Sequence, residues 1–177
     1  MLINSKTAEY DAVIQAANTI CAAIRTAPKG CGFDFLDSAI LTDEDKDKIS
    51  AEMRKIGESH GERGAFFARD AGNVDNSQAV VLVGATYDTR KLSKMCQLCG
   101  FESCSACSEA GAACVFAGVD LGIALGSAVS KLAELGIDNR IMYTIGKAAA
   151  ALGYLGEYKM IMGIPLSVSC KSPFFDR

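Results

Sequence analysis

Five of the eight cysteines of this chain lie within the twenty-one residues from 94 to 114. They follow one another as C-x2-C-x4-C-x2-C-x6-C, at Cys96, Cys99, Cys104, Cys107 and Cys114. Two cysteines separated by two residues on a tight turn direct both thiols to the same side. Because thiolates are ligands for zinc and for iron–sulfur clusters, and are also the reacting groups of redox relays, this segment is the first candidate for chemistry.

The short gap between the two C-x2-C pairs argues against a zinc ribbon. Structural zinc sites commonly separate such pairs by roughly 12 to 20 residues, whereas here only four residues intervene. An iron–sulfur cluster is larger than a single ion, and its ligands often follow one another closely on one loop. The spacing therefore favours an iron–sulfur cluster, with zinc, a disulfide relay and simple burial of small residues as the alternatives.

Two sets of four cysteines are compatible with such a cluster. Cys99, Cys104 and Cys107 reproduce the plant-type C-x4-C-x2-C triplet, with Cys114 or Cys170 as the fourth ligand. The competing set is Cys96, Cys99, Cys104 and Cys114. Spacing does not choose between them.

Other catalytic arrangements have little support in the sequence. His60 is the single histidine and lies in the polar stretch IGESHGERG, which is typical of a surface position. A Ser-His-Asp or Cys-His site would need this residue, and no GxSxG motif accompanies it. The Gly146-Lys147 pair lacks the glycine spacing and the following hydroxyl of a P-loop.

The composition predicts a folded, acidic protein. Half of the residues are apolar and the net charge is −3, with dispersed cations, so nucleic acid is not an expected partner. The N-terminus lacks a secretory signal and the longest apolar stretch is interrupted by Asp120, so we expect a cytoplasmic protein without a membrane span. We expect one domain over residues 1–177, with a cysteine-rich metal-binding insertion at 94–116.

The elements that must position the cysteines follow from hydrophobic periodicity. Two strands are expected, a buried one in AVVLVGATY and a final one in YKMIMGIPLS. The helices are expected at residues 8–25, from about 42 to 57, near 64–73, from Asp120 to 135, and at 139–153. Strands separated by helices without a βαβ repeat indicate an α+β fold.

The stretches CQLCGFESCSACSEAGAAC, DLGIALGSAVSKLAELGI and GIPLSVSCKSPFFDR resemble a family of small bacterial and archaeal proteins described as uncharacterised ferredoxin-domain proteins. CQLCGFESC is also similar to the CxxCGxxxC iron–sulfur module of corrinoid and electron-transfer proteins. This resemblance implies a cluster, of the 4Fe–4S type, with Cys107 as a spare thiol. The ligands that it implies are Cys96, Cys99, Cys104 and Cys114.

The whole layout also resembles the flavin-dependent nitroreductases. That resemblance implies a mixed or antiparallel sheet flanked by helices, a homodimer, and FMN at the dimer interface. The arginine pair by which that family holds the FMN phosphate is absent before the first helix, and the cations near the matching segments are Arg25, Lys29, Lys171 and Arg177.

Together the two resemblances imply a redox protein, either an electron carrier or an oxidoreductase, that passes electrons from an iron–sulfur cluster to a flavin or to a soluble protein or small-molecule acceptor. The alternatives are a zinc-stabilised interaction module without catalysis and an FMN-binding flavoprotein whose cysteines are incidental.

Overall fold

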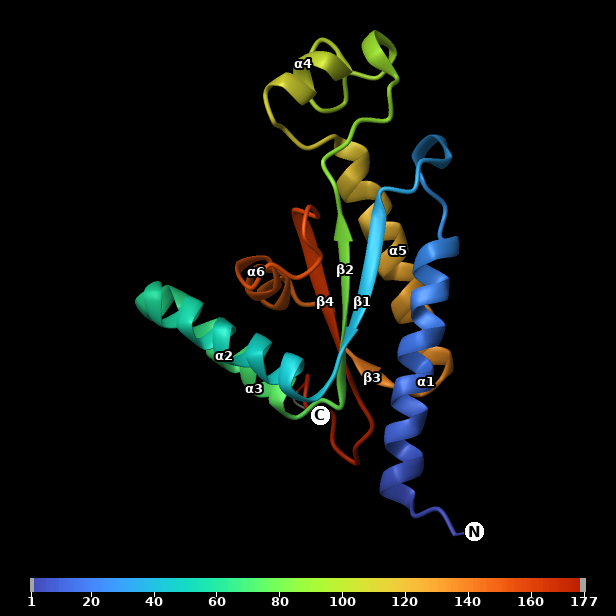
Figure 1. Ribbon diagram of the computed structural model, residues 1–177, viewed down its shortest axis with the longest axis vertical. Coiled ribbons are helices and arrows are strands. Elements are labelled where there is room, and N and C mark those ends of the chain that lie inside the picture. Colours follow the sequence, from blue (N-terminus) through green and yellow to red (C-terminus); the bar gives the residue numbers. More distant parts are fainter. Residues whose placement is uncertain (1, 176–177) are drawn as a thin grey trace.

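The computed structural model describes residues 2–175 and contains one four-stranded antiparallel sheet (Figure 1). β2 pairs with β1 on one side and with β4 on the other, and the short β3 pairs with β4. The register places Ala85, at the end of β2, opposite both Leu36 and Met160. In the order β1-β2-β4-β3, the strands are Leu36–Leu41, Ala79–Ala85, Met160–Ser167 and Asp138–Asn139.

Helices cover both faces of the sheet (Figure 1). Because successive side chains of a strand point to opposite faces, β2 supplies Val81 and Val83 to one hydrophobic core and Val80 and Leu82 to the other. The first core is closed by α1 and α5, and the second by α2, α3 and α6. These helices are Ser5–Thr26, Val115–Glu134, Asp43–Ser59, Ala65–Asp75 and Tyr143–Ala151. The expected α+β fold is therefore confirmed.

Three features of the fold differ from the sequence-based expectation. The short β3 was not expected, and it includes Asn139, so the helix expected at 139–153 begins only at Tyr143. β1 was not expected, because LDSAIL lacks a clear alternation; it is an edge strand whose central residues are only half-buried. The helix expected to begin at Asp120 begins at Val115, with Cys114 at its N-cap. Asp120 is buried and accepts a hydrogen bond from the Gly30 N–H, so it is an interior polar residue rather than a cap.

The connection between β2 and α5, residues 86–114, projects beyond one end of the sheet (Figure 1). We call it the cysteine connection, because it carries all five clustered cysteines. It contains two short helices, η3 (Ser93–Met95) and α4 (Cys104–Glu109). Its two stems are joined where the Cys114 N–H donates to the Tyr87 carbonyl at 3.1 Å. The start of α1 lies at the opposite end of the molecule (Figure 1).

α5 is the one helix among residues 2–175 whose length and apolar composition would allow it to cross a membrane. Core helices of other proteins meet the same criterion. In this fold, Leu121, Leu125 and Leu132 of α5 lie in the core that α5 shares with α1 and the sheet.

Candidate metal centre

Local structure places four of the clustered cysteines on defined elements. Cys104 and Cys107 are three residues apart on α4 and therefore lie on the same face of that helix. The side chain of Ser103 caps α4 by accepting the Ala106 N–H at 3.2 Å. Cys99 precedes Gly100, whose φ of 82° turns the chain back toward α4. Cys114 is the N-cap of α5.

The Cys107 thiol is fully buried and interacts with three other thiols. Burial raises the pKa of the Cys107 thiol, and its hydrogen bond to Cys99 and the charges of Cys99, Cys114 and Cys104 raise that pKa further. Cys107 as a thiolate would therefore be repelled by thiolates at Cys99, Cys104 and Cys114. A bound cationic centre would relieve this repulsion, because a coordinating metal favours the thiolate form.

Backbone groups also contact the sulfurs. The Ser93 N–H donates to the Cys104 Sγ at 3.1 Å, and the Cys107 thiol contacts the Ala112 carbonyl at 3.5 Å. Hydrogen bonds from N–H groups to ligand sulfurs tune the reduction potential of iron–sulfur clusters. The first of these contacts is therefore of the kind that a cluster ligand makes.

Cys96 and Cys170 are placed differently. Cys96 is half-buried and follows η3 directly. Cys170 follows the far end of β4, whereas the cysteine connection leaves the sheet at Ala85, opposite the start of β4. Since β4 has eight residues, roughly 25 Å of strand separates these two ends of the sheet. The geometry therefore favours Cys114 over Cys170 as a fourth ligand, and the role expected of Cys96 stays a prediction.

The described residues do not form a preassembled metal site. Within residues 2–175, no three His, Cys, Asp or Glu side chains converge as a single metal ion would require. An iron–sulfur cluster is larger and holds its four thiolates further apart, so four neighbouring thiols on one connection suit it.

A buried ion pair lies at the base of the cysteine connection. Arg90 donates to the Asp120 carboxylate from Nε at 3.1 Å and from Nη2 at 2.6 Å, and both side chains are almost completely buried. Arg90 also donates to the Asp88 carbonyl and lies over the Phe35 ring, 4.8 Å from its centroid. The other Asp120 oxygen accepts the Gly30 N–H at 2.9 Å. The pair therefore joins the first stem of the connection to α5.

Two of the cations expected to hold FMN have structural partners. Arg25 donates to Asp34 at 2.5 Å and to Asp37 at 3.1 Å. Partial burial raises the pKa of the Asp34 carboxyl, but the hydrogen bond from Arg25 and the charges of Lys29 and Arg25 outweigh it and lower that pKa overall. Lys29 donates to three carbonyls at the end of α1, including that of Arg25 at 2.6 Å. Arg177 lies outside the described residues.

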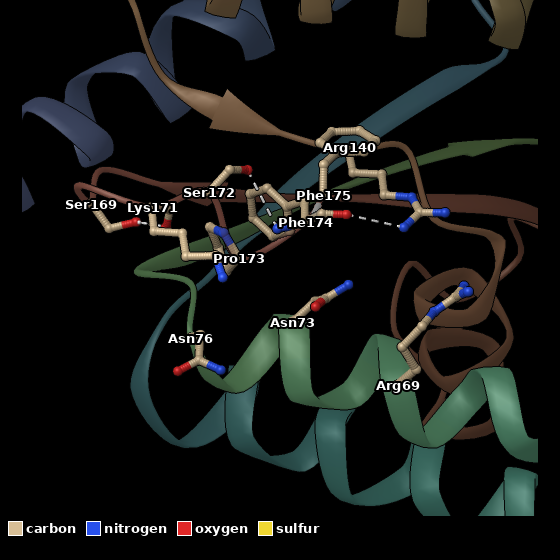
Figure 2. Close-up of a pocket in the computed structure, with 10 residues that line it drawn as sticks. All are labelled: Arg69, Asn73, Asn76, Arg140, Ser169, Lys171, Ser172, Pro173, Phe174 and Phe175. Atoms are coloured by element: carbon tan, nitrogen blue, oxygen red, sulfur yellow. Dashed lines mark hydrogen bonds between the residues drawn. The ribbon is translucent and has the colours of Figure 1, made fainter. Parts of the chain in front are cut away.

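Lys171 lines a basic cavity of about 550 Å³ beyond the far end of β4 (Figure 2). Arg69 and Asn73 reach it from α3, and Arg140 borders it from the opposite side (Figure 2). Arg140 donates to the Phe174 carbonyl at 3.2 Å, and Arg69 pairs with Asp70. The sequence did not identify Arg69 or Arg140, because both are distant from Lys171 along the chain.

Solved structures identify the class of fold. The chain is similar to a nitroreductase with bound FMN from Desulfitobacterium hafniense, with a TM-score of 0.59 and 17% identity over 100% of this chain and 85% of that one. It is also similar to a nitroreductase with bound FMN from Bacteroides fragilis, with a TM-score of 0.62 and 12% identity over 100% and 83% of the two chains. The fold is thus nitroreductase-like, as expected, and in this chain the cysteine connection links β2 to α5.

Sequence comparison identifies the family. An uncharacterized protein from Archaeoglobus fulgidus is 45% identical over 185 residues, covering 100% of this chain and 98% of the relative. Residues 110–177 match the family described as "Uncharacterized protein containing a ferredoxin domain". The chain belongs to this family of ferredoxin-domain proteins, which confirms the resemblance seen in its sequence.

Proposed function

We propose that this protein transfers electrons through an iron–sulfur cluster held by the cysteine connection. The observation that carries the proposal is the buried Cys107 thiol, which interacts with Cys99, Cys104 and Cys114. Membership of a ferredoxin-domain family and a nitroreductase-like fold both support a redox role. The ligand set that we propose is Cys99, Cys104, Cys107 and Cys114, and the set implied by the CxxCGxxxC resemblance, which has Cys96 in place of Cys107, is the alternative that the variants below distinguish.

The chain's own residues would contribute binding and tuning. A 4Fe–4S cluster, when bound, supplies a centre that gains and loses one electron. The four thiols lose their protons as they bind iron, so cluster binding is favoured at higher pH. The Ser93 N–H stabilises charge on the Cys104 sulfur, and the burial of Cys107 and Cys114 limits access of water to their sulfurs.

The proposal is tested by spectroscopy on protein purified without oxygen. We expect a brown protein whose visible absorbance falls when dithionite reduces it, and whose reduced form gives an electron paramagnetic resonance signal. A colourless protein with one tightly bound zinc per chain and no response to dithionite would instead support the interaction module.

The proposal extends to a flavin in the basic cavity. The phosphate of FMN would be attracted by three cations, Lys171, Arg69 and Arg140. The cavity volume of about 550 Å³ is within the size range of pockets for such ligands. The fold supports this ligand, because two nitroreductases of similar structure were solved with bound FMN. Within one chain, the cavity and the cysteine connection lie at opposite ends of β4. A soluble acceptor is therefore the partner that a cluster in the connection would reach directly.

Replacing Lys171 by alanine is expected to weaken FMN binding by about tenfold, because one cation opposite the phosphate is removed. The measurement is titration of FMN fluorescence with the protein. Arg25→Gln is the matched control: it also removes one positive charge, but Arg25 pairs with Asp34 and Asp37 outside the cavity. Equal weakening in both variants, or none in Lys171→Ala, would contradict the assignment of this cavity to FMN.

We expect a homodimer in which α5 contacts its symmetry mate. The exposed face of α5 is apolar, and three glycines four residues apart permit two helix backbones to approach closely. This face consists of Val115, Gly118, Val119, Gly122, Ile123 and Gly126. Light scattering should give twice the chain mass for the natural protein and a single chain mass for Val119→Lys/Ile123→Lys. A double variant that stays dimeric would place the interface elsewhere, and Leu2→Lys serves as an exposed apolar control.

A further inference from the structure

Four exposed basic and apolar residues lie in the first half of the cysteine connection, next to its cysteines in the sequence, and one of them, Lys91, also places its ammonium over the Phe33 ring, 5.8 Å from the centroid. We call these residues the tip patch: they are Lys91, Lys94, Met95 and Leu98. All four residues are exposed, and the two apolar side chains are 86% exposed at Met95 and 66% exposed at Leu98. Large apolar side chains with so much exposure suggest a surface that another molecule covers.

The tip patch adjoins the thiols directly. Leu98 precedes Cys99, and Met95 precedes Cys96. Lys91 lines a small cavity together with the Cys104 ligand, and Ser93, which donates to the Cys104 Sγ, lies between Lys91 and Lys94. A molecule covering the tip patch would therefore lie close to a cluster held by these cysteines.

The charge of the tip patch opposes that of the whole protein. Residues 90–98 contain three cations and no carboxylate, whereas the chain as a whole carries a net charge of −3. Arg90 is neutralised by Asp120 inside the protein, so Lys91 and Lys94 are the exposed charges of this stretch. The connection also carries the acids Glu102 and Glu109, and the Glu102 carbonyl accepts a hydrogen bond from the Gln97 side chain at 3.2 Å, next to Leu98. A partner approaching the tip patch is thus favoured if its own surface is negative.

We infer that the tip patch docks a small acidic electron-carrier protein, and this inference rests on the proposed cluster. In the complex, the reduced carrier loses one electron and the cluster gains it, and no bond or proton is exchanged. Two lysines and two apolar side chains would give a small contact surface, as is typical of the weak, transient interfaces of electron-transfer complexes. A second copy of this chain is a poor occupant, because it would oppose lysine to lysine.

The test uses an acidic bacterial ferredoxin as the probe, and calorimetry measures its dissociation constant at low ionic strength. Lys91→Glu/Lys94→Glu is expected to weaken binding by at least about tenfold, with the difference shrinking as salt is added. The control Lys6→Glu/Lys55→Glu makes the same change in net charge on α1 and α2, and should stay within about twofold of the natural protein. Met95→Ser/Leu98→Ser should weaken binding at both low and high salt.

Several results would overturn the docking inference. These are an unchanged dissociation constant in the Lys91→Glu/Lys94→Glu variant, an equal loss in the control, or tighter binding of the basic carrier cytochrome c than of the ferredoxin. Calorimetry measures the heat of binding and does not show whether a cluster is present or electrons are transferred. Iron content is therefore measured separately on the same samples. Protein that holds iron and responds to dithionite but does not bind the ferredoxin refutes the docking alone. Protein that lacks iron refutes the proposed function on which the inference rests.

Discussion

Replacing Cys107 by serine is expected to abolish cluster binding, whereas replacing Cys96 by serine should leave iron and sulfide contents close to those of the natural protein. Cys107 is fully buried and shares one face of α4 with Cys104, whereas Cys96 is half-buried and lies before that helix. Loss of a cluster ligand should lower the affinity for the metal by more than the roughly 10- to 100-fold that follows from changing residues around the ligands.

Iron and acid-labile sulfide in anaerobically reconstituted variants measure this effect. Cys170→Ser is a further control, because Cys170 follows the opposite end of β4. If the ligands are those implied by the CxxCGxxxC resemblance, the effects of the Cys96 and Cys107 replacements on iron content should be reversed. If Cys96→Ser loses its iron and Cys107→Ser keeps it, the cluster is held by Cys96, Cys99, Cys104 and Cys114.

Replacing Asp120 by alanine is expected to destabilise the protein by about 3–5 kcal/mol, since removal of one partner from a buried ion pair leaves an uncompensated charge. Arg90 would lose both of its contacts with the Asp120 carboxylate, and the Gly30 N–H would lose its acceptor. Because Arg90 is in the first stem of the cysteine connection, we also expect weaker retention of iron in this variant.

Urea unfolding of the anaerobic protein measures the loss of stability. Arg90→Met/Asp120→Leu removes both charges and fills similar volume, so it should recover most of the free energy lost in Asp120→Ala. The exposed pair Lys48–Asp45 provides the comparison: Asp45 also accepts the Tyr154 hydroxyl, and Asp45→Ala should still destabilise the protein much less than Asp120→Ala. An Asp120→Ala variant as stable as Asp45→Ala would show that the buried pair does not anchor the connection.

Much of the fold could be predicted because its long elements carry strong periodic patterns. The apolar run of β2 is buried on both faces, and α1 repeats its buried residues at helical spacing. β1 was missed because an edge strand needs only part of its surface buried. Asp120 was expected at a helix start because aspartate is a common N-cap, whereas its actual role depends on Arg90, thirty residues away in the sequence.

The candidate site could be predicted only as a segment. The spacing identified the five cysteines but did not predict which of them lie near one another. The sequence of α4 is short and made of small residues, so it gave no periodic pattern from which a helix could be predicted. The Ser103 cap is the local signal that could have placed Cys104 and Cys107 on one helical face. Arg25 and Lys29 were expected to bind the flavin. Instead, Arg25 pairs with Asp34, and Lys29 donates to backbone carbonyls such as that of Arg25. Of the expected FMN ligands among residues 2–175, Lys171 alone lines the basic cavity.

The central claim is that this protein carries an iron–sulfur cluster, and analysis of iron and acid-labile sulfide in protein purified without oxygen tests it most directly. We expect equal amounts of iron and sulfide, approaching about four of each per chain after reconstitution, as a 4Fe–4S cluster requires. Colourless protein that still contains neither iron nor sulfide after anaerobic reconstitution would contradict this claim.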